Sequence, residues 1–417
     1  MRLVRVWLKT VLAICCAGWA GLATGHEGDT FRPFVSAGHF QDSNLFRLAR
    51  SEYSSLPPGY AKQDRYALYQ AGINVDWKPG RQQVVASAAK TLIRYARNDF
   101  LDFDGDDLQA RWNWRLGNRL SGQLGASRVT SQSGFENIGL VDNHERRERR
   151  FVRAEWEPHP RWRVGGGLGT LDNTHSAPSQ RSQDVRQDNQ ELNIAYLTRK
   201  GSRLGAQLRH LEADYPNMQV MALVPVQYVA DNSFRQDEFN LTGEWKLSAK
   251  LSLNTQAGWV KRRYDNRLKP TPLPAPSLVD RPDHSGVTAR VGADWSPTAK
   301  TRVNAAFYQE LGGATDINAS SVLKRGLNLD AAWLIREKWQ MNAGLNFENR
   351  DFRGDPGALS GLTRRDDDTT NANLVVRYMP TRAVSLDVGI QAGRRSSNLA
   401  NEDFRYRTLF VSVRGDF

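Results

Sequence analysis

Arginine is the residue type with the most evident chemistry in this chain. Eleven arginines fall on the polar side of segments in which apolar and polar residues alternate: Arg94, Arg111, Arg115, Arg153, Arg163, Arg203, Arg209, Arg290, Arg302, Arg377 and Arg414. Eight carboxylates share that side: Glu155, Glu244, Asp294, Glu310, Asp330, Glu348, Asp387 and Asp416. A guanidinium stays charged and pairs with carboxylate and phosphate groups. The set predicts either a salt-bridged, solvated interior or a conduit whose arginines concentrate anions, and the two interpretations are compatible.

Other residue combinations that could do chemistry are weak. The stretch "LDFDGDDL" at 101–108 gathers Asp102, Asp104, Asp106 and Asp107, as a calcium loop does. Its glycine is misplaced for an EF-hand and no glutamate closes it, so a solvated hairpin tip is the better interpretation. The histidines, at 26, 39, 144, 159, 175, 210 and 284, belong to no HExxH motif, and no GxSxG motif occurs. We expect no enzymatic activity, no metal and no cofactor.

The N-terminus has the features of a secretory signal peptide. Basic residues between Arg2 and Lys9 precede an apolar stretch at 11–23, and small residues lead to Gly25. The stretch is short for a membrane-spanning helix, and no later apolar run reaches about 18 residues. Both cysteines, at 15 and 16, lie inside it, which leaves a mature chain without disulfides or thiolate ligands. We expect residues 1–25 to be removed and residues 26–417 to form a single domain.

The charge of the chain restricts its partners. The 417 residues carry a net charge of +12. An exported basic protein suggests anionic partners such as acidic glycans, lipopolysaccharide or phosphate groups. Nucleic acid fits poorly, because the chain is secreted and has no basic helix, and we expect none.

One turn pattern recurs along the chain. "DWKPGR" at 76–81, "EWEPHPR" at 155–161, "EWKLSAK" at 244–250 and "DWSPTAK" at 294–300 each join an aromatic residue, a short turn and a basic residue. Looser copies lie at 113–119, 195–203, 332–338 and 377–382. The flanking segments alternate with a period of two, as β-strands do. Two strands around each of these eight turns, with a first strand at 31–40 and a last strand at 403–417, predict 18 antiparallel strands.

Two all-β architectures use this many strands. A propeller would place four short strands in each repeat, whereas each repeat here holds two long strands, which suit a transmembrane antiparallel β-barrel. Longer polar connections alternate with the short turns, at about 41–63, 98–103, 132–146, 173–186, 214–234, 266–283, 313–322, 352–367 and 396–403. Both termini should therefore lie on the short-turn, periplasmic side. Sixteen strands is the alternative, because Pro33 interrupts the first strand.

The aromatic residue of each turn pattern falls on the apolar face beside the turn. We expect these residues to form one girdle at the membrane edge: Trp77, Trp114, Trp156, Tyr196, Trp245, Trp295, Trp333 and Tyr378. The alternative is an ordinary sandwich core. The last strand alternates and ends on Phe417, which resembles the signal that the barrel-assembly machinery recognises. We predict that Phe417 is an assembly signal and that the protein lies in the outer membrane of a Gram-negative bacterium, among lipid and lipopolysaccharide.

Some segments resemble a known family. The mature chain begins "FRPFVSAGHFQDSNLFRLAR", and its stretch "DSNLFRL" at 42–48 resembles the entry motif of EpsL-type outer-membrane proteins, which occur with exosortase and PEP-CTERM systems. "DLQARWNWRLGNRLSGQLGASR" at 107–128 and the alternating C-terminus are similar to the same family, so that the resemblance spans most of the mature chain. It implies exopolysaccharide biosynthesis or export, with an anionic polysaccharide and periplasmic export proteins as partners, and no catalytic residues.

Three functions remain open at this point. The first is an outer-membrane barrel for exopolysaccharide biosynthesis and export, with an arginine-rich lumen as its conduit. The alternative is a general or anion-preferring porin for small solutes. The third is an enzymatic or adhesive barrel, although barrel architecture by itself does not imply catalysis.

Overall fold

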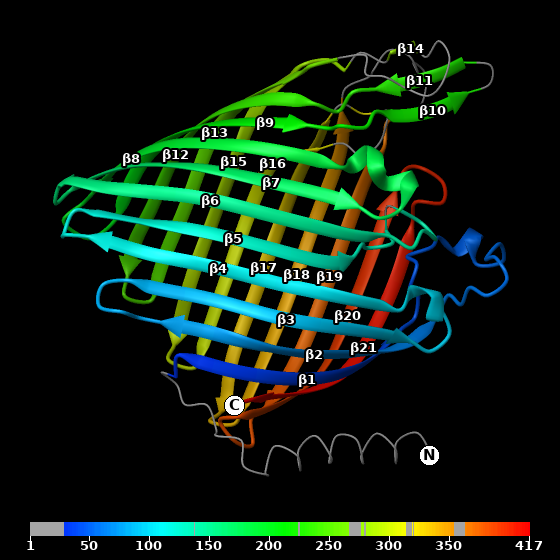
Figure 1. Ribbon diagram of the computed structural model, residues 1–417, viewed down its shortest axis with the longest axis horizontal. Helices are drawn as coiled ribbons and strands as arrows, with labels where there is room; N and C mark the ends of the chain where they lie inside the picture. The colour runs from blue at the N-terminus through cyan, green and yellow to red at the C-terminus, as the bar shows by residue number, and fades with distance from the viewer. Residues whose placement is uncertain are drawn as a thin grey trace.

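The computed structural model describes residues 29–136, 138–223, 226–266, 277–278, 281–313, 319, 321–353 and 363–417. The expected signal peptide, residues 1–25, lies outside these ranges. The described residues form a closed, antiparallel 18-stranded barrel (Figure 1). Closure is direct, because the first strand pairs with both the second strand and the last. The predicted fold class is therefore confirmed, and the alternative of 16 strands is wrong.

The strands of the barrel follow one another in chain order around the wall. They are β1 (Phe31–Asp42), β2 (Asp64–Trp77), β3 (Gln83–Tyr95), β4 (Phe103–Leu116), β5 (Leu120–Gln132), β6 (His144–His159), β7 (Trp162–His175), β8 (Val185–Leu197), β9 (Arg203–Asp214), β12 (Phe234–Ser248), β13 (Leu251–Tyr264), β15 (His284–Thr298), β16 (Thr301–Gly313), β17 (Ser321–Arg336), β18 (Trp339–Arg353), β19 (Asp366–Tyr378), β20 (Val384–Ser397) and β21 (Phe404–Asp416).

The recurring turn pattern forms the hairpins at one end of the barrel. Gly80 and Gly117 have φ angles of 62° and 60°, a backbone conformation that glycine adopts without a steric penalty. In four of the hairpins the register shifts just beyond the aromatic residue: between Trp156 and His159, Lys246 and Ser248, Trp295 and Thr298, and Leu334 and Arg336. Bulges at a barrel rim bend the strand and end its regular pairing. The turn pattern therefore marks where each pair of strands stops.

The seam between the first and last strands accommodates the proline that made the strand count uncertain. Pro33 lies opposite Ile73 of β2, near the start of β1. On the other side the regular ladder with β21 begins one residue later, at Phe34. The carbonyl of Pro33 accepts a hydrogen bond of 2.8 Å from the amide of Phe417. A proline lacks only the N–H group, so its position at a strand start does not prevent closure.

Each strand presents an apolar outer face and a polar inner face. Leucine, valine and tryptophan side chains dominate the exposed outward residues, for example Leu208, Leu241 and Val291. A strand of about 14 residues is roughly 46 Å long, and with the usual barrel tilt it extends beyond an apolar band of about 25 Å. The strand ends next to the long loops therefore emerge from the membrane and carry charged residues on their outer face.

The long connections lie at the opposite end of the barrel from the short turns. They contain three 3-10 turns, η1 (Arg50–Glu52), η2 (Asp99–Leu101) and η3 (Pro178–Gln183). They also contain a small sheet of β10 (Gln219–Leu223), β11 (Val226–Ala230) and β14 (Ser277–Leu278), seen above the barrel in Figure 1. None of the helices among the described residues is long and apolar enough to cross a membrane. Long loops at one end and short turns at the other are typical of extracellular and periplasmic sides respectively.

Candidate functional site in the barrel lumen

All eight aromatic residues expected in the girdle lie on the outer face at the short-turn end. The strand register shows this, since Trp77 lies opposite Val84, Trp295 opposite Val303 and Tyr378 opposite Leu386. Further tryptophans that the turn pattern did not single out join them: Trp112, Trp162 and Trp339. Trp162 contacts Tyr196 with ring centroids 5.2 Å apart, and Trp339 stacks on Tyr378 at 4.6 Å. Their positions in the sequence could have placed them in the girdle. Trp162 and Trp339 begin the strand that follows a short turn, and Trp112 lies two residues before Trp114 on the same face of β4.

Ten of the eleven arginines lie on the inner face. These are Arg111, Arg115, Arg153, Arg163, Arg203, Arg209, Arg290, Arg302, Arg377 and Arg414, whose neighbours in sequence are the outward apolar residues. The eight carboxylates named with them also face inward. The lumen is therefore lined by both signs of charge.

Arg94 is the exception, and its expected place in the lumen is wrong. It lies opposite Ala67 on the outer face of β3, next to the long loops. Its guanidinium pairs with Asp104 at 2.7 Å and with Asp102 at 3.7 Å. The strand continues past the apolar band at this end, so a charged residue on its outer face meets headgroups and water rather than hydrocarbon.

Six of the inward arginines are neutralised by carboxylates. Arg377 makes a two-pronged pair with Asp387 at 2.7 and 2.9 Å, and Arg414 pairs with Asp416 at 2.8 Å. Arg163 and Arg203 contact Glu157 and Glu155, both at 2.9 Å. The remaining two pairs are Arg153 with Glu191 at 2.8 Å and Arg209 with Glu238 at 3.4 Å. Paired charges contribute little to the field along the pore, which supports the interpretation of a salt-bridged interior for this part of the set.

A glycine on β7 makes room for one of these pairs. Gly167 lies between Arg153 of β6 and Glu191 of β8 in the strand register. A Cβ atom at this position would lie 2.8 Å from Cγ of Arg153 and 2.9 Å from Oε1 of Glu191. The ion pair thus crosses over β7 only because residue 167 has no side chain.

The other four of these ten arginines have no carboxylate partner within 4.0 Å among the described residues. Arg111 and Arg115 lie on β4, and Arg290 and Arg302 lie on β15 and β16. By strand count these two groups occupy opposite walls of the barrel. We therefore expect these four arginines, rather than all eleven, to attract anions into the lumen.

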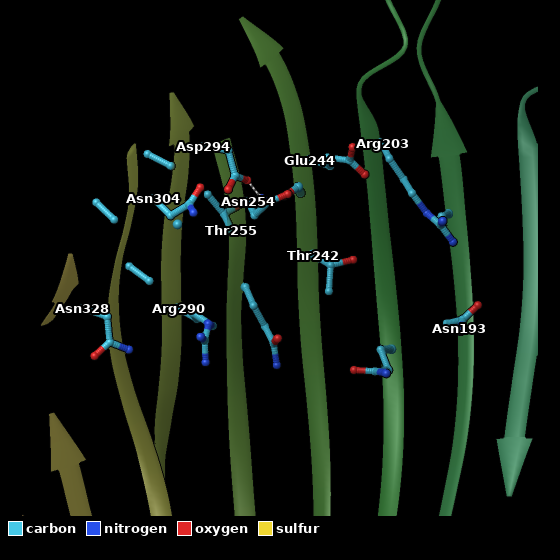
Figure 2. A pocket seen from close by; sticks show the side chains of 18 of the residues that line it. Asn193, Arg203, Thr242, Glu244, Asn254, Thr255, Arg290, Asp294, Asn304 and Asn328 are labelled. Carbon is cyan, nitrogen blue, oxygen red and sulfur yellow. Dashed lines mark hydrogen bonds between the residues drawn. The ribbon is translucent and has the colours of Figure 1, made fainter. Parts of the chain in front are cut away.

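The wall from β8 to β17 contains a polar hollow of about 640 Å³. Amide side chains line it at Asn193, Gln207, Asn254, Gln256, Asn304 and Asn328, together with the carboxylates of Glu244, Asp294 and Asp330 and the guanidinium groups of Arg203 and Arg290 (Figure 2). Asn254 donates a hydrogen bond of 2.9 Å to Asp294. None of these amides is among the residues that the sequence pattern predicted for the lumen. Their even spacing on the polar side of the strands was the signal that could have found them.

The loops cover one sector of the long-loop end. Leu45, Phe46 and Leu48 from the β1–β2 loop form a buried cluster with Leu101 and Phe135 from the next two long loops. Phe46 and Phe135 meet edge to face with ring centroids 5.0 Å apart. Residues of the β1–β2 and β5–β6 loops and inner-face aromatics of β1 to β3 line one shared cavity, so these two loops lie over the lumen.

The aspartate-rich segment at 101–108 is part of the wall. Asp106 pairs with Lys90 at 3.0 Å, and Asp102 accepts a hydrogen bond of 2.8 Å from the amide of Tyr95. In the ranges that the structure covers, no group of three or more His, Cys, Asp or Glu side chains is arranged to hold a metal ion. These contacts favour the interpretation as an ordinary hairpin tip.

A closed barrel with an apolar outer band, an aromatic belt and a charged lumen defines an outer-membrane, porin-like protein of a Gram-negative bacterium. The family model described as "Putative beta-barrel porin 2" matches residues 244–417. No curated protein matches the chain.

Solved structures with a similar outline include known outer-membrane proteins. The outer membrane protein OpdK from Pseudomonas aeruginosa is 10% identical, with 94% of this chain and 100% of that chain covered and a TM-score of 0.48. OpdF from the same organism, solved with glucuronate, is 11% identical, with 93% and 98% covered and a TM-score of 0.48. A BenF-like porin from Pseudomonas fluorescens is 8% identical, with 94% and 100% covered and a TM-score of 0.48.

Proposed function

We propose that this protein is a porin that conducts small polar solutes across the outer membrane. The observation that carries the proposal is the hollow in the wall from β8 to β17, where amides, carboxylates and guanidinium groups face the lumen together. Such groups exchange hydrogen bonds with a hydrated solute as readily as with water, so a polar molecule can pass without a large desolvation cost. The match of residues 244–417 to a porin family model supports the same conclusion.

The charge arrangement favours weak rather than strong ion selectivity. The unpaired arginines of β4 face a wall that carries both signs of charge. On that wall Arg290 and Arg302, like the carboxylates of Glu244, Asp294 and Asp330, have no oppositely charged partner within 4.0 Å among the described residues. Mixed charges around the lumen leave the net potential along the pore small. We therefore expect a modest preference for anions, weaker than the number of arginines in the lumen suggests.

The loop cluster at the extracellular end favours small solutes over a polymer. The buried contacts between Phe46, Leu101 and Phe135 hold three loops together, and two of these loops line the cavity at the mouth of the lumen. A polymer strand would have to displace this cluster, whereas small molecules need only the uncovered part of the mouth. A role in exopolysaccharide biosynthesis or export is supported only by the resemblance of the segments at 31–50 and 107–128 to EpsL-type proteins. The matching family is described as a porin.

The test combines conductance with a genetic readout. We expect the purified barrel to form steady channels in a planar bilayer and to let mono- and disaccharides, but not long dextrans, swell proteoliposomes. Passage of charged and neutral solutes of equal size at similar rates would support weak selectivity. A barrel that shows no conductance, together with a deletion strain that loses extracellular polysaccharide but keeps normal solute uptake, would overturn the porin assignment in favour of the polysaccharide role.

A further inference from the structure

Four arginines gather on the outer face of the barrel around its seam. Arg394 lies on β20, Arg405 and Arg407 on β21, and Arg65 on β2, and all four are exposed. We call this group the seam patch. Arg394 lies directly opposite Arg405 in the strand ladder, and Arg407 is two residues along the same face of β21. Arg65 is two strands away, on the far side of β1.

The seam patch lies just beyond the apolar band, toward the extracellular end. On β21 the next outward residues toward the membrane are Leu409 and Val411, which are 53% and 38% exposed. On β20 the corresponding outward residue is Ile390, two positions beyond Ala392. The side chains of the patch are thus at the height of the headgroups of the outer leaflet, where long basic side chains are favoured.

The patch gathers four basic residues that have no counter-charge. Most other basic residues on the outer face at this end pair with acids, for example Lys90 with Asp106, Arg94 with Asp104, Arg128 with Glu148, Arg235 with Glu212 and Arg263 with Asp237, at 2.6–3.2 Å. Lys261 and Arg325 are exceptions, but neither lies opposite another basic residue in its ladders. No described carboxylate lies within 4.0 Å of the four guanidinium groups of the patch. Like charges directly opposite each other in a ladder destabilise it, so an anion bound from outside the chain would stabilise the pair of Arg394 and Arg405.

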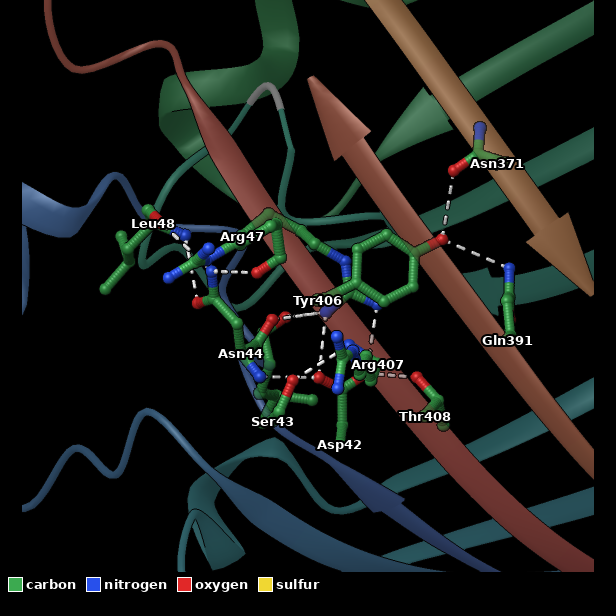
Figure 3. Close-up of polar contacts among 12 residues, drawn as sticks. Asp42, Ser43, Asn44, Arg47, Leu48, Asn371, Gln391, Tyr406, Arg407 and Thr408 are labelled. Atoms are coloured by element: carbon green, nitrogen blue, oxygen red, sulfur yellow. Dashed lines mark hydrogen bonds and ion pairs between the residues drawn. The ribbon is translucent and has the colours of Figure 1, made fainter. Parts of the chain in front are cut away.

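The β1–β2 loop fixes the backbone that displays the patch (Figure 3). Ser43 donates its amide to the carbonyl of Arg407 at 3.0 Å, and Arg407 donates its amide to Oγ of Ser43 at 2.8 Å. The buried side chain of Asn44 donates to the carbonyl of Arg405 at 3.1 Å. These bonds extend the β1–β21 pairing past the end of β1, so the stretch "DSNLFRL" holds the two arginines in a fixed outward arrangement.

We propose that the seam patch binds the phosphate groups of a glycolipid of the outer leaflet, with diphosphorylated lipid A as the chemical type. A guanidinium binds phosphate through two parallel hydrogen bonds, and several on a fixed backbone bind more than one phosphate group. The apolar surface at Leu409 and Val411 directly beneath the patch receives acyl chains, which a free phosphate does not have. The spread of the patch over β20 to β2 suits a headgroup with two separate phosphates.

The experiment measures lipid binding to the full-length mature barrel in detergent by native mass spectrometry and titration calorimetry. The probes are diphosphorylated lipid A, dephosphorylated lipid A and phosphatidylglycerol. The test variant is Arg394→Gln with Arg405→Gln, and the matched control is Arg128→Gln with Arg235→Gln, which removes two paired arginines at the same end. We expect the test variant to bind diphosphorylated lipid A about tenfold more weakly or worse, and the control to bind as the wild type does.

Two further readouts keep the result independent of folding. The conservative variant Arg394→Lys with Arg405→Lys keeps the charge and should recover most of the binding. Without lipid A, the Gln variant should unfold at a higher denaturant concentration than the wild type, because the like-charged pair is gone. Wild-type affinity in the Gln variant would overturn the site, as would equal binding of dephosphorylated lipid A. Equal binding of phosphatidylglycerol would overturn the glycolipid and identify an ordinary phospholipid phosphate instead.

Discussion

Asp42 and Arg47 form a two-pronged ion pair, with Nη1–Oδ1 and Nη2–Oδ2 distances of 3.0 Å each. The guanidinium of Arg47 also lies 3.6 Å from the centroid of the Tyr406 ring (Figure 3). The pair closes a tight turn in which Arg47 has a φ angle of 55°, a conformation that costs energy for a non-glycine residue. It connects the β1–β2 loop to the last strand and holds the start of the loop cluster over the lumen.

Replacing Arg47 with methionine should release this loop. Asp42, whose side chain is 3% exposed, would lose its guanidinium partner, and losing one partner of a buried pair costs about 3–5 kcal/mol. We expect the barrel to remain folded, the loop at 43–63 to become sensitive to protease, and channel recordings to become noisier. Arg50→Met, in the exposed first position of η1, is the control. Unchanged proteolysis and quiet recordings from Arg47→Met would show that the pair does not hold the loop.

The unpaired lumen charges should set the ion selectivity in opposite directions. Arg111→Gln with Arg115→Gln removes two unpaired cations from one wall and should move the reversal potential under a salt gradient toward cations. Glu244→Gln with Asp294→Asn should move it toward anions. Arg377→Gln with Asp387→Asn removes a neutral pair and should leave the reversal potential nearly unchanged. Equal shifts from all three double variants would contradict the division into paired and unpaired charges.

Neighbouring residues on β16 test which face meets lipid. Ala305 faces outward opposite Ala293, and Ala306 faces the lumen opposite Gly292. Ala305→Arg should lower the free energy of unfolding in lipid vesicles by about 2–4 kcal/mol, as for a cation near the bilayer centre. Ala306→Arg should cost much less, because its side chain enters the water-filled lumen. Urea titration of vesicle-embedded protein measures both, and a larger loss for Ala306→Arg would reverse the assignment of the two faces.

Deleting Phe417 should impair assembly in cells more than stability in vitro. The amide of Phe417 contributes one hydrogen bond to Pro33, and a single such bond adds about 0.5–1.5 kcal/mol. We expect much less heat-modifiable, folded barrel in the outer membrane of the deletion strain. The same protein should refold into lipid vesicles almost as well as the wild type. Equal losses in both settings would indicate a structural role for Phe417 rather than a role as an assembly signal.

Much of the barrel follows from local sequence. The period of two between outward residues such as Val287, Val291 and Trp295 assigns each side chain to a face, whatever the partner strand. The aromatic residue before each short turn places the membrane edge for the same local reason, because the turn limits how far the strand can continue. The strand count and the positions of ten of the eleven arginines could therefore be predicted without knowledge of tertiary contacts.

Tertiary structure alone decided what those charges do. Whether Arg153 is neutralised depends on Glu191, which lies two strands away and is reached across Gly167. Whether Arg94 meets lipid or headgroup depends on how far β3 extends beyond the apolar band, a matter of strand tilt and length. The contact of residues 43 and 44 with β21 arises only when the barrel closes. Alternation is a property of one strand, whereas charge pairing depends on the register between strands, which the sequence of a single strand does not contain.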